Sequence, residues 1–142
     1  MKLNSQITVD KVYYPDFDSD ETGKINVKTT GGTTLYGIKL KRGYVDFGIC
    51  KDKILYIASG GGLYAADLNG ENDHYISDGE YSFTAYSEPF ALCYNSKSNT
   101  SVLINLENSE LTPFANGYVT AFEYDSGVVF YSLKGENHIK EL

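Results

Sequence analysis

Three aspartates alternate with other residues near the start of the chain, at Asp16, Asp18 and Asp20. Alternating carboxylates can direct several hard oxygen ligands toward one centre, which is the chemistry of a calcium site. An EF-hand loop beginning at Asp16 would need glycine at its sixth position and glutamate at its twelfth, where this sequence has Glu21 and Val27. We therefore exclude an EF-hand. A looser calcium or magnesium site stays open beside a solvated acidic hairpin, which the run of charge favours.

Other residue types with reactive side chains form no recognisable site. His74 and His138 have no second ligand at metal-binding spacing. No serine lies in a G-x-S-x-G sequence, and the glycine run 60–62 lacks the lysine and hydroxyl residue of a phosphate loop. Cys50 and Cys93 are too few for a disulfide framework and are expected to be buried free thiols. We predict no enzyme: no catalytic residue, no assigned metal ligand and no cofactor.

Tyrosine offers a different chemistry, because its ring provides a large, stiff and amphipathic contact surface. The chain has 13 tyrosines and no tryptophan. One group falls on expected strands, where the rings would pack between repeats: Tyr13, Tyr14, Tyr36, Tyr56, Tyr64, Tyr94 and Tyr131. A second group lies at or near the entrances of strands, and we predict that it forms a ligand-binding face: Tyr44, Tyr81, Tyr86, Tyr118 and Tyr124.

A repeat must position these residues, because Tyr44, Tyr81 and Tyr118 are separated by equal steps of 37 residues. A fixed period of this size indicates stacked units that cannot each bury their own apolar face. The clearest copy alternates strand-like runs with turns, ending in Asn69-Gly70, a strong hairpin signal. Its central run, 54–57, is continuously apolar, as expected for a strand covered on both faces.

The whole chain, 1–142, is predicted to be one all-β domain of about three and a half antiparallel repeats. The copies are an irregular first repeat at 5–43, full repeats at 44–80 and 81–117, and a partial repeat at 118–142. In the first copy, we interpret 16–32 as a long excursion between strands, one form of which is a protruding hairpin with Ile25 and Val27 on its return, and Thr33–Leu40 as the third strand. Only three residues separate Leu40 from Tyr44, so the fourth strand of this copy is predicted to be missing.

Residues 52–72 carry a resemblance to known repeats, in particular the Asp67-Leu68-Asn69-Gly70 sequence that closes the third strand. They resemble the YWTD-type β-propeller blades of low-density-lipoprotein-receptor proteins and, more closely, bacterial propeller repeats of undefined function. The resemblance covers 44–142 well and 5–40 loosely, although the chain lacks the tryptophan of the YWTD motif. It implies a propeller-like fold, with a small β-sandwich as the alternative.

Three and a half repeats are too few for a typical propeller, which closes with four to eight blades. Open repeats would leave unpaired strand edges, which invite another chain to pair. The sequence is therefore consistent with a piece of a larger propeller, or with a homodimer or other self-association that completes a ring.

Charge and hydropathy exclude several classes of partner. The formal net charge is −7, with 19 acidic and 12 basic residues. This balance opposes binding to nucleic acid or to anionic membranes, which select basic surfaces. No signal peptide or transmembrane segment is recognisable, so we expect a cytoplasmic protein by default. The predicted function is a non-catalytic module that binds a protein partner. The alternatives are a small acidic inhibitor or immunity-type protein that blocks a basic effector, and a glycan- or small-ligand-binding protein.

Overall fold

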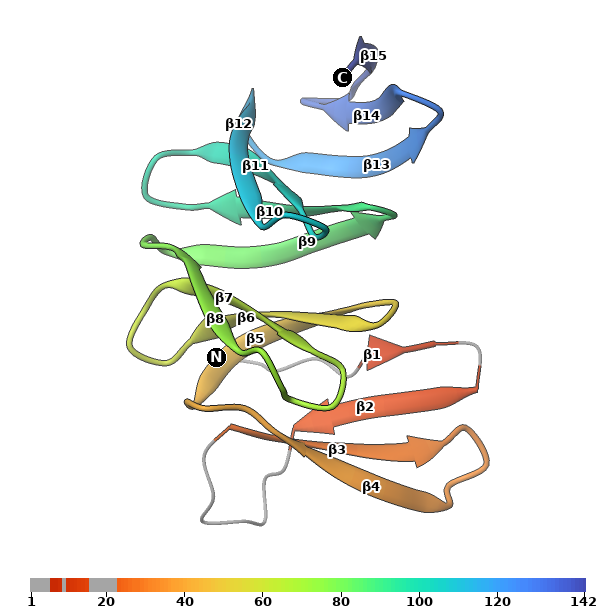
Figure 1. Cartoon of the computed structure of the whole chain (residues 1–142). Helices are drawn as coiled ribbons and strands as arrows, with labels where there is room; N and C mark the ends of the chain where they lie inside the picture. The colour runs from red at the N-terminus through yellow and green to blue at the C-terminus, as the bar shows by residue number, and fades with distance from the viewer. Residues whose placement is uncertain (1–5, 9, 16–22) are drawn as a thin grey trace.

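The computed structural model describes residues 6–8, 10–15 and 23–142, which form fifteen β-strands in four antiparallel sheets (Figure 1). The all-β, antiparallel prediction is confirmed. No helix in these ranges is long and apolar enough to cross a membrane. Asp16, Asp18 and Asp20 lie outside the described residues, together with the acidic hairpin and the alternative cation site predicted there.

Each sheet is built from strands that are consecutive in the chain and pair with their sequence neighbours. Sheet 1 contains β1 (Gln6–Ile7), β2 (Lys11–Pro15), β3 (Lys24–Thr29) and β4 (Thr34–Lys39). Sheet 2 contains β5 (Tyr44–Cys50), β6 (Lys53–Ala58), β7 (Leu63–Asp67) and β8 (His74–Ser77). Sheet 3 contains β9 (Tyr81–Ser87), β10 (Phe90–Asn95), β11 (Thr100–Asn105) and β12 (Glu110–Asn116). Sheet 4 contains β13 (Val119–Asp125), β14 (Val128–Leu133) and β15 (Glu136–Glu141).

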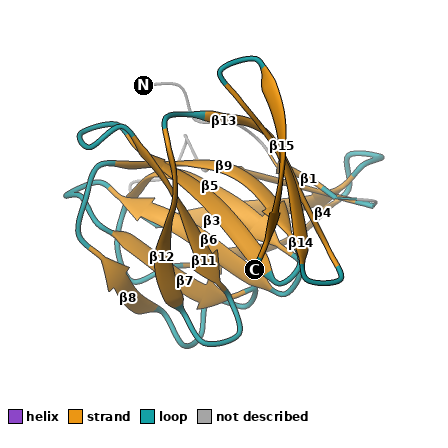
Figure 2. Ribbon diagram, turned by 90° about the horizontal axis from the view of Figure 1, so that it is seen from above, coloured by secondary structure: helices purple, strands orange, loops and turns teal. Residues whose placement is uncertain are grey.

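The four sheets are stacked face to face in chain order, with sheet 1 at the bottom of Figure 1 and sheet 4 at the top. Figure 2 looks down this stack, where the sheets overlie one another. The first strands β5, β9 and β13 contact one another in succession, and the later strands of each sheet extend away from them. This repeated radial arrangement is propeller-like, in place of the two packed layers of a sandwich.

The strand assignment for the first repeat was wrong in two respects. Residues Thr33–Leu40 were expected to form the third strand, but the third strand is β3 and this segment contains the fourth, β4. The fourth strand of sheet 1 is therefore present. Ile25 and Val27 of β3 are fully buried against sheet 2, whereas Lys24, Asn26 and Lys28 alternate with them on the opposite face.

Apolar side chains fill three layers, one between each pair of successive sheets. Strand β6 shows the reason for its continuous apolar run. Tyr56 packs in the layer shared with sheet 1, whereas Leu55 and Ile57 pack in the layer shared with sheet 3. The prediction that this strand is covered on both faces is confirmed. Burial of both faces removes apolar surface from water and is the main favourable contribution to stacking.

Polar contacts also join neighbouring sheets at the step of the sequence repeat. The Asp46 carboxylate on β5 accepts the backbone N–H of Phe83 on β9 at 2.9 Å, across 37 residues. The Ser87 hydroxyl on β9 accepts the backbone N–H of Tyr124 on β13 at 2.8 Å, again across 37 residues. Burial raises the pKa of Asp46 above its ordinary value, although the N–H donors oppose that rise. These bonds fix the position of each first strand along the first strand of the next sheet.

A buried polar cluster connects the loops around sheet 2. Oδ1 of Asp73, in the β7–β8 connection, accepts the Tyr56 hydroxyl at 2.6 Å and Nη1 of Arg42 at 3.1 Å. Oδ2 of Asp73 accepts the backbone N–H of Lys41 at 2.8 Å. The Arg42 guanidinium also lies over the ring of Tyr64, 4.0 Å from its centroid. The cluster holds the chain at the point where it passes from sheet 1 to sheet 2.

Candidate functional site

Strands β5, β9 and β13 begin at the same rim of the stack, on the left in Figure 1, which we call the entrance rim. Tyr44 is the first residue of β5 and Tyr81 the first of β9, and Tyr118 immediately precedes β13. The turn that joins β6 to β7 and the turn that joins β10 to β11 lie at this rim as well, because each second strand runs back toward it. Three of the five tyrosines predicted to bind a ligand are thus at the entrance rim.

A groove of about 690 Å³ opens at this rim between sheets 2 and 3. We call it the rim groove. It is apolar at its base and carries tyrosines and hydroxyl groups around its mouth, and its lining contains Val45, Ile57, Ala58, Ser59, Gly60, Gly61, Gly79, Glu80, Tyr81, Ser82, Tyr94 and Ser96. Glu80 is the charged residue of this lining. A volume of this size is in the range of small-molecule and peptide sites.

The β6–β7 turn adds few side-chain atoms to one side of the rim groove, because it contains a run of glycines. The N–H of Gly61 bonds to the carbonyl of Ala58, and the N–H of Ala58 bonds to the carbonyl of Gly62. Gly61 has φ of 94°, a conformation that favours glycine over residues with a Cβ. A side chain added at Gly60 would begin in open space. The glycine run predicted as a turn is therefore a turn, and the lack of side chains there leaves the groove accessible.

Aromatic side chains form the other wall. The Tyr81 hydroxyl lies 3.2 Å from the Ser77 hydroxyl, and the Tyr94 hydroxyl donates to Oδ1 of Asn99 at 2.6 Å. The edge of the Tyr118 ring meets Tyr94 with centroids 5.2 Å apart, and 50% of Tyr118 is exposed. Tyr118 therefore extends the aromatic surface from the rim groove toward sheet 4.

The remaining predicted tyrosines lie elsewhere. Tyr44 donates its hydroxyl to the carbonyl of Lys24 at 2.6 Å, and so contributes to the contact between sheets 1 and 2. Tyr86 and Tyr124 are in the far halves of β9 and β13, away from the entrance rim. Burial raises the pKa of Tyr86 to about 12, and the Tyr124 ring packs edge-on against Phe90 at 4.9 Å. The structure thus places Tyr81 in the lining of the rim groove and Tyr118 beside it, against Tyr94, and separates the other three from it.

Tyr94 belongs to this surface, although the sequence placed it among the tyrosines that pack between repeats. It lies one residue before the end of β10, and its hydroxyl is directed to the exposed β10–β11 turn. The useful signal would have been its position at the end of a second strand, because that end returns to the same rim at which the first strand begins.

The side chains that line the rim groove can bind a ligand through apolar surface and hydrogen bonds. Serine hydroxyls there have no histidine among the lining residues to act as a base. In the described ranges, no three His, Cys, Asp or Glu residues lie close enough together to hold a metal ion. The rim groove can offer ring faces, hydroxyl donors and one carboxylate acceptor to a ligand.

Comparison with known proteins finds similarity in fold. No protein-family model matches the chain, and no curated protein matches its sequence. The computationally designed Ika4 protein matches with a TM-score of 0.62 at 14% identity, over 97% of this chain and 89% of Ika4. BamB from Moraxella catarrhalis matches with a TM-score of 0.59 at 10% identity, over 98% of this chain and 46% of BamB. The N-terminal domain of Nup159 matches with a TM-score of 0.54 at 15% identity, over 97% of this chain and 43% of the Nup159 chain.

The fold is propeller-like. These identities establish architecture alone, and the resemblance to YWTD-type blades and to bacterial propeller repeats stays a prediction. The chain spans less than half the length of BamB and of the Nup159 domain, but most of Ika4. Its four sheets therefore correspond to part of the larger proteins.

Proposed function

We propose that this chain is a non-catalytic binding module, and that the rim groove holds a segment of a protein partner. The observation that carries this proposal is the combination of an open apolar groove with the Tyr81, Tyr94 and Tyr118 rings beside it. Tyrosine is enriched at protein interfaces because it adds contact area at a small cost in conformational entropy. One of the similar structures is a chain of the complex in which S. cerevisiae Dbp5 is bound to Nup159.

An extended peptide segment suits the groove better than a globular surface. The lining combines apolar residues near the ends of two strands, Ile57 and Val45, with the serines Ser59 and Ser82. A peptide can place an apolar side chain at the base and satisfy its own backbone groups with those hydroxyls. We expect affinity to come chiefly from the tyrosine rings, with only a weak dependence on salt.

A library of random peptides displayed on phage tests the proposal directly. Wild-type protein is panned, and the selected peptides are then tested on Gly60→Trp, which adds an indole to a residue of the groove lining where a Cβ would meet no other atom within 4 Å. Selected peptides are labelled, and their affinity is measured by fluorescence anisotropy. We expect Gly60→Trp to abolish binding, and Tyr118→Ala to weaken it by about tenfold, as for a residue that contributes more than 1 kcal/mol.

Gly31→Trp is the matched control. Gly31 occupies the same position in the β3–β4 turn as Gly60 does in the β6–β7 turn. Each is followed by a glycine with a positive φ, 95° at Gly32 and 94° at Gly61. Both sites have space for a side chain, but the β3–β4 turn is at the opposite rim. We expect Gly31→Trp to bind the peptides as the wild type does. Peptides that bind Gly60→Trp equally well, or a library with no enrichment on the wild type, would contradict the proposal.

The two alternative functions give different responses in the same measurement. A small acidic inhibitor would bind basic partners, and its affinity would fall steeply with added salt because surface charge is screened. A glycan-binding protein would show competition by free oligosaccharides at the same groove. Weak salt dependence, loss of binding in Tyr118→Ala and no competition by oligosaccharides distinguish a peptide-binding module from both.

A further inference from the structure

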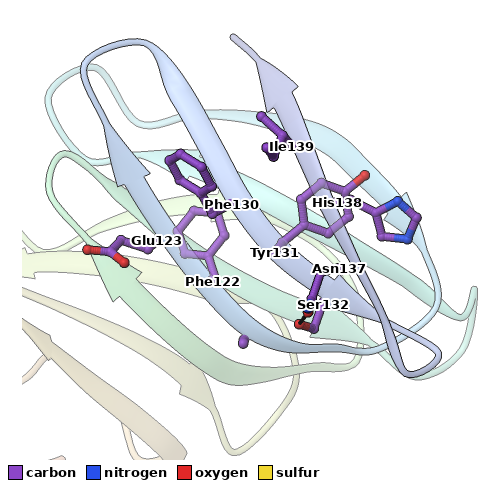
Figure 3. A pocket seen from close by; sticks show the side chains of 9 residues that line it. Phe122, Glu123, Phe130, Tyr131, Ser132, Asn137, His138 and Ile139 are labelled. Carbon is purple, nitrogen blue, oxygen red and sulfur yellow. Dashed lines mark hydrogen bonds between the residues drawn. The ribbon is translucent and has the colours of Figure 1, made fainter.

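Sheet 4 exposes an apolar face at the upper end of the stack. In the strands β13, β14 and β15, alternate residues point away from sheet 3, among them Phe130 and Ile139. Phe130 is 46% exposed and Ile139 is 70% exposed, and together they line a hollow of about 470 Å³ (Figure 3). This surface, which we call the sheet 4 face, has no neighbouring sheet in the described chain.

The register of the strands shows that a neighbour would be expected there. Phe130 pairs with Ile139 across β14 and β15. The equivalent pairs in the other sheets are Leu92 with Leu103 and Leu55 with Ala65. All four of those residues point toward the next sheet and have exposures between 0% and 4%. The pair in sheet 4 keeps the apolar character of a position that is buried in every preceding repeat.

The outward face of sheet 1 has the opposite character. Lys28 pairs with Val12, and it occupies the position of Ala66 in sheet 2 and of Ile104 in sheet 3, both of which are buried. Lys24 lies on the same face by strand alternation, and Lys39 pairs directly with Lys24. The Lys28 ammonium lies over the ring of Tyr14, 5.2 Å from its centroid. This surface, which we call the sheet 1 face, is therefore basic and partly aromatic in its described residues.

Acidic residues complement it on the sheet 4 face. Glu123 pairs with Phe130, and Glu141 and Asp125 both pair with Val128, so all three carboxylates are on the outward side. The three are exposed. Two sheet 4 faces placed together would bring these carboxylates against one another, whereas a sheet 4 face placed on a sheet 1 face would bring them to lysines. Unlike charges across an interface favour the second arrangement.

We propose that two copies of this chain associate head to tail, with the sheet 4 face of each copy packed on the sheet 1 face of the other. Such an interface is heterologous, because two different surfaces meet, and two copies related by a twofold axis form two of them and close into a ring. The ring would have eight sheets, within the range of four to eight that closes a propeller. This inference does not depend on the rim groove, and the half-length match to BamB is consistent with it.

Light scattering after gel filtration measures the assembly directly. We expect the wild type to have twice the mass of the 15.7 kDa chain at micromolar concentration. Ile139→Lys on the sheet 4 face and Lys28→Glu on the sheet 1 face should each give a monomer of unchanged circular dichroism. Tyr75→Lys is the matched control, because Tyr75 is 52% exposed on β8, outside both faces, and should leave the dimer intact.

Mixing the two monomeric variants distinguishes head-to-tail pairing from a symmetric contact. The Lys28→Glu chain keeps a native sheet 4 face and the Ile139→Lys chain keeps a native sheet 1 face, so the mixture can form one native junction. We expect a mixture of the two variants to recover dimer, while each variant alone does not. A monomeric wild type, a dimer that Lys28→Glu leaves intact, or a mixture that stays monomeric would overturn the proposal. A ladder of longer oligomers would overturn the closed two-chain ring.

Discussion

Replacement of Asp73 by alanine tests whether the polar cluster beside sheet 2 stabilises the stack. The Asp73 side chain is fully buried and accepts hydrogen bonds from the Tyr56 hydroxyl, the backbone N–H of Lys41 and the Arg42 guanidinium. Burial raises the pKa of the Tyr56 hydroxyl, so this group remains a donor at neutral pH. Alanine leaves the buried Tyr56 hydroxyl, the partly buried N–H of Lys41 and one guanidinium without their acceptor.

The expected loss follows from those three groups. A buried donor left unsatisfied costs about 1–3 kcal/mol, which applies in full to the Tyr56 hydroxyl and only in part to the partly buried N–H of Lys41, so the two together cost about 2–4 kcal/mol. The Arg42 side chain is 35% exposed, and water can therefore solvate part of its charge. We expect Asp73→Ala to lower the free energy of unfolding by about 3–4 kcal/mol, close to the lower part of the range for breaking a buried ion pair. That is a large share of a total stability of about 5–15 kcal/mol.

Urea unfolding followed by circular dichroism, at one fixed protein concentration, measures this loss. Tyr56→Phe removes the hydroxyl that donates to Asp73 and accepts from Nη1 of Arg42, but it keeps the bond between Arg42 and Asp73, so its cost should be only about 1 kcal/mol. Lys53→Met is the surface control. It breaks the Lys53–Asp67 ion pair, whose side chains are 37% and 28% exposed, and should cost at most about 1 kcal/mol. An Asp73→Ala loss no larger than that of Lys53→Met would refute the reasoning.

Three further predictions concern the layers between sheets. Gly48→Ala should destabilise the protein by about 1–3 kcal/mol in urea unfolding, because the added carbon would overlap the Phe83 ring, and Phe83→Leu in the same chain should recover part of the loss. The thiols of Cys50 and Cys93 should stay unreacted with a disulfide reagent at about pH 8 until denaturant is added. Burial raises the pKa of Cys50 to about 12 and that of Cys93 well above its ordinary value, so equal reaction rates in native and denatured protein would contradict this. Because the folded pKa of Asp46 is raised, its contribution to stability is fully present below its ordinary pKa of about 4 and is lost as pH rises through the folded pKa. Asp46→Asn should cost less relative to the wild type as pH rises from about 4 to 7, and urea unfolding that shows a constant or growing cost would exclude this linkage.

The sequence predicted the repeat and the antiparallel strands because the period of 37 residues reappears as physical contact. Asp46 and Phe83 are one period apart, as are Ser87 and Tyr124, and each pair is hydrogen-bonded between sheets. A residue that contacts its own equivalent region in the next copy constrains both copies in the same way. Such constraints recur at one fixed spacing along the chain, so the repeat is visible in the sequence itself.

The first repeat was misassigned for a physical reason. Strand β3 alternates Ile25 and Val27 with Lys24, Asn26 and Lys28, and the polar residues lie on a face that no other sheet of the described residues covers. Only two of the six residues of β3 are apolar, compared with five of six in β6, which is covered on both sides. The expected strand pattern was that of residues 44–80, which form sheet 2 and are covered on both faces. A terminal strand covered on one face departs from this pattern and resembles part of a polar excursion.

The tyrosines show that residues at the same repeat position can make different contacts. Tyr44 and Tyr81 hold the same repeat position, yet Tyr44 bonds to the carbonyl of Lys24 on sheet 1 while Tyr81 lines the rim groove. The difference comes from the preceding sheet, because the groove beside Tyr81 depends on the glycines of the β6–β7 turn in sheet 2. A contact between two copies depends on both of them, and one position in one copy does not specify it.

The exposure of a side chain depends on its neighbours in the same way, because it is set by whether a further sheet covers it. Leu55 and Leu92 are buried because a later sheet covers them, whereas Phe130, at the equivalent position of sheet 4, is exposed because residues 6–8, 10–15 and 23–142 form no sheet beyond sheet 4. Terminal units of repeat proteins usually carry a polar outer face, which keeps them soluble. Lys28 and Asn26 give sheet 1 such a face, but Phe130 and Ile139 leave sheet 4 without one. An exposed apolar pair at a position that is buried in the other copies is the expected signature of a surface that is covered by another molecule.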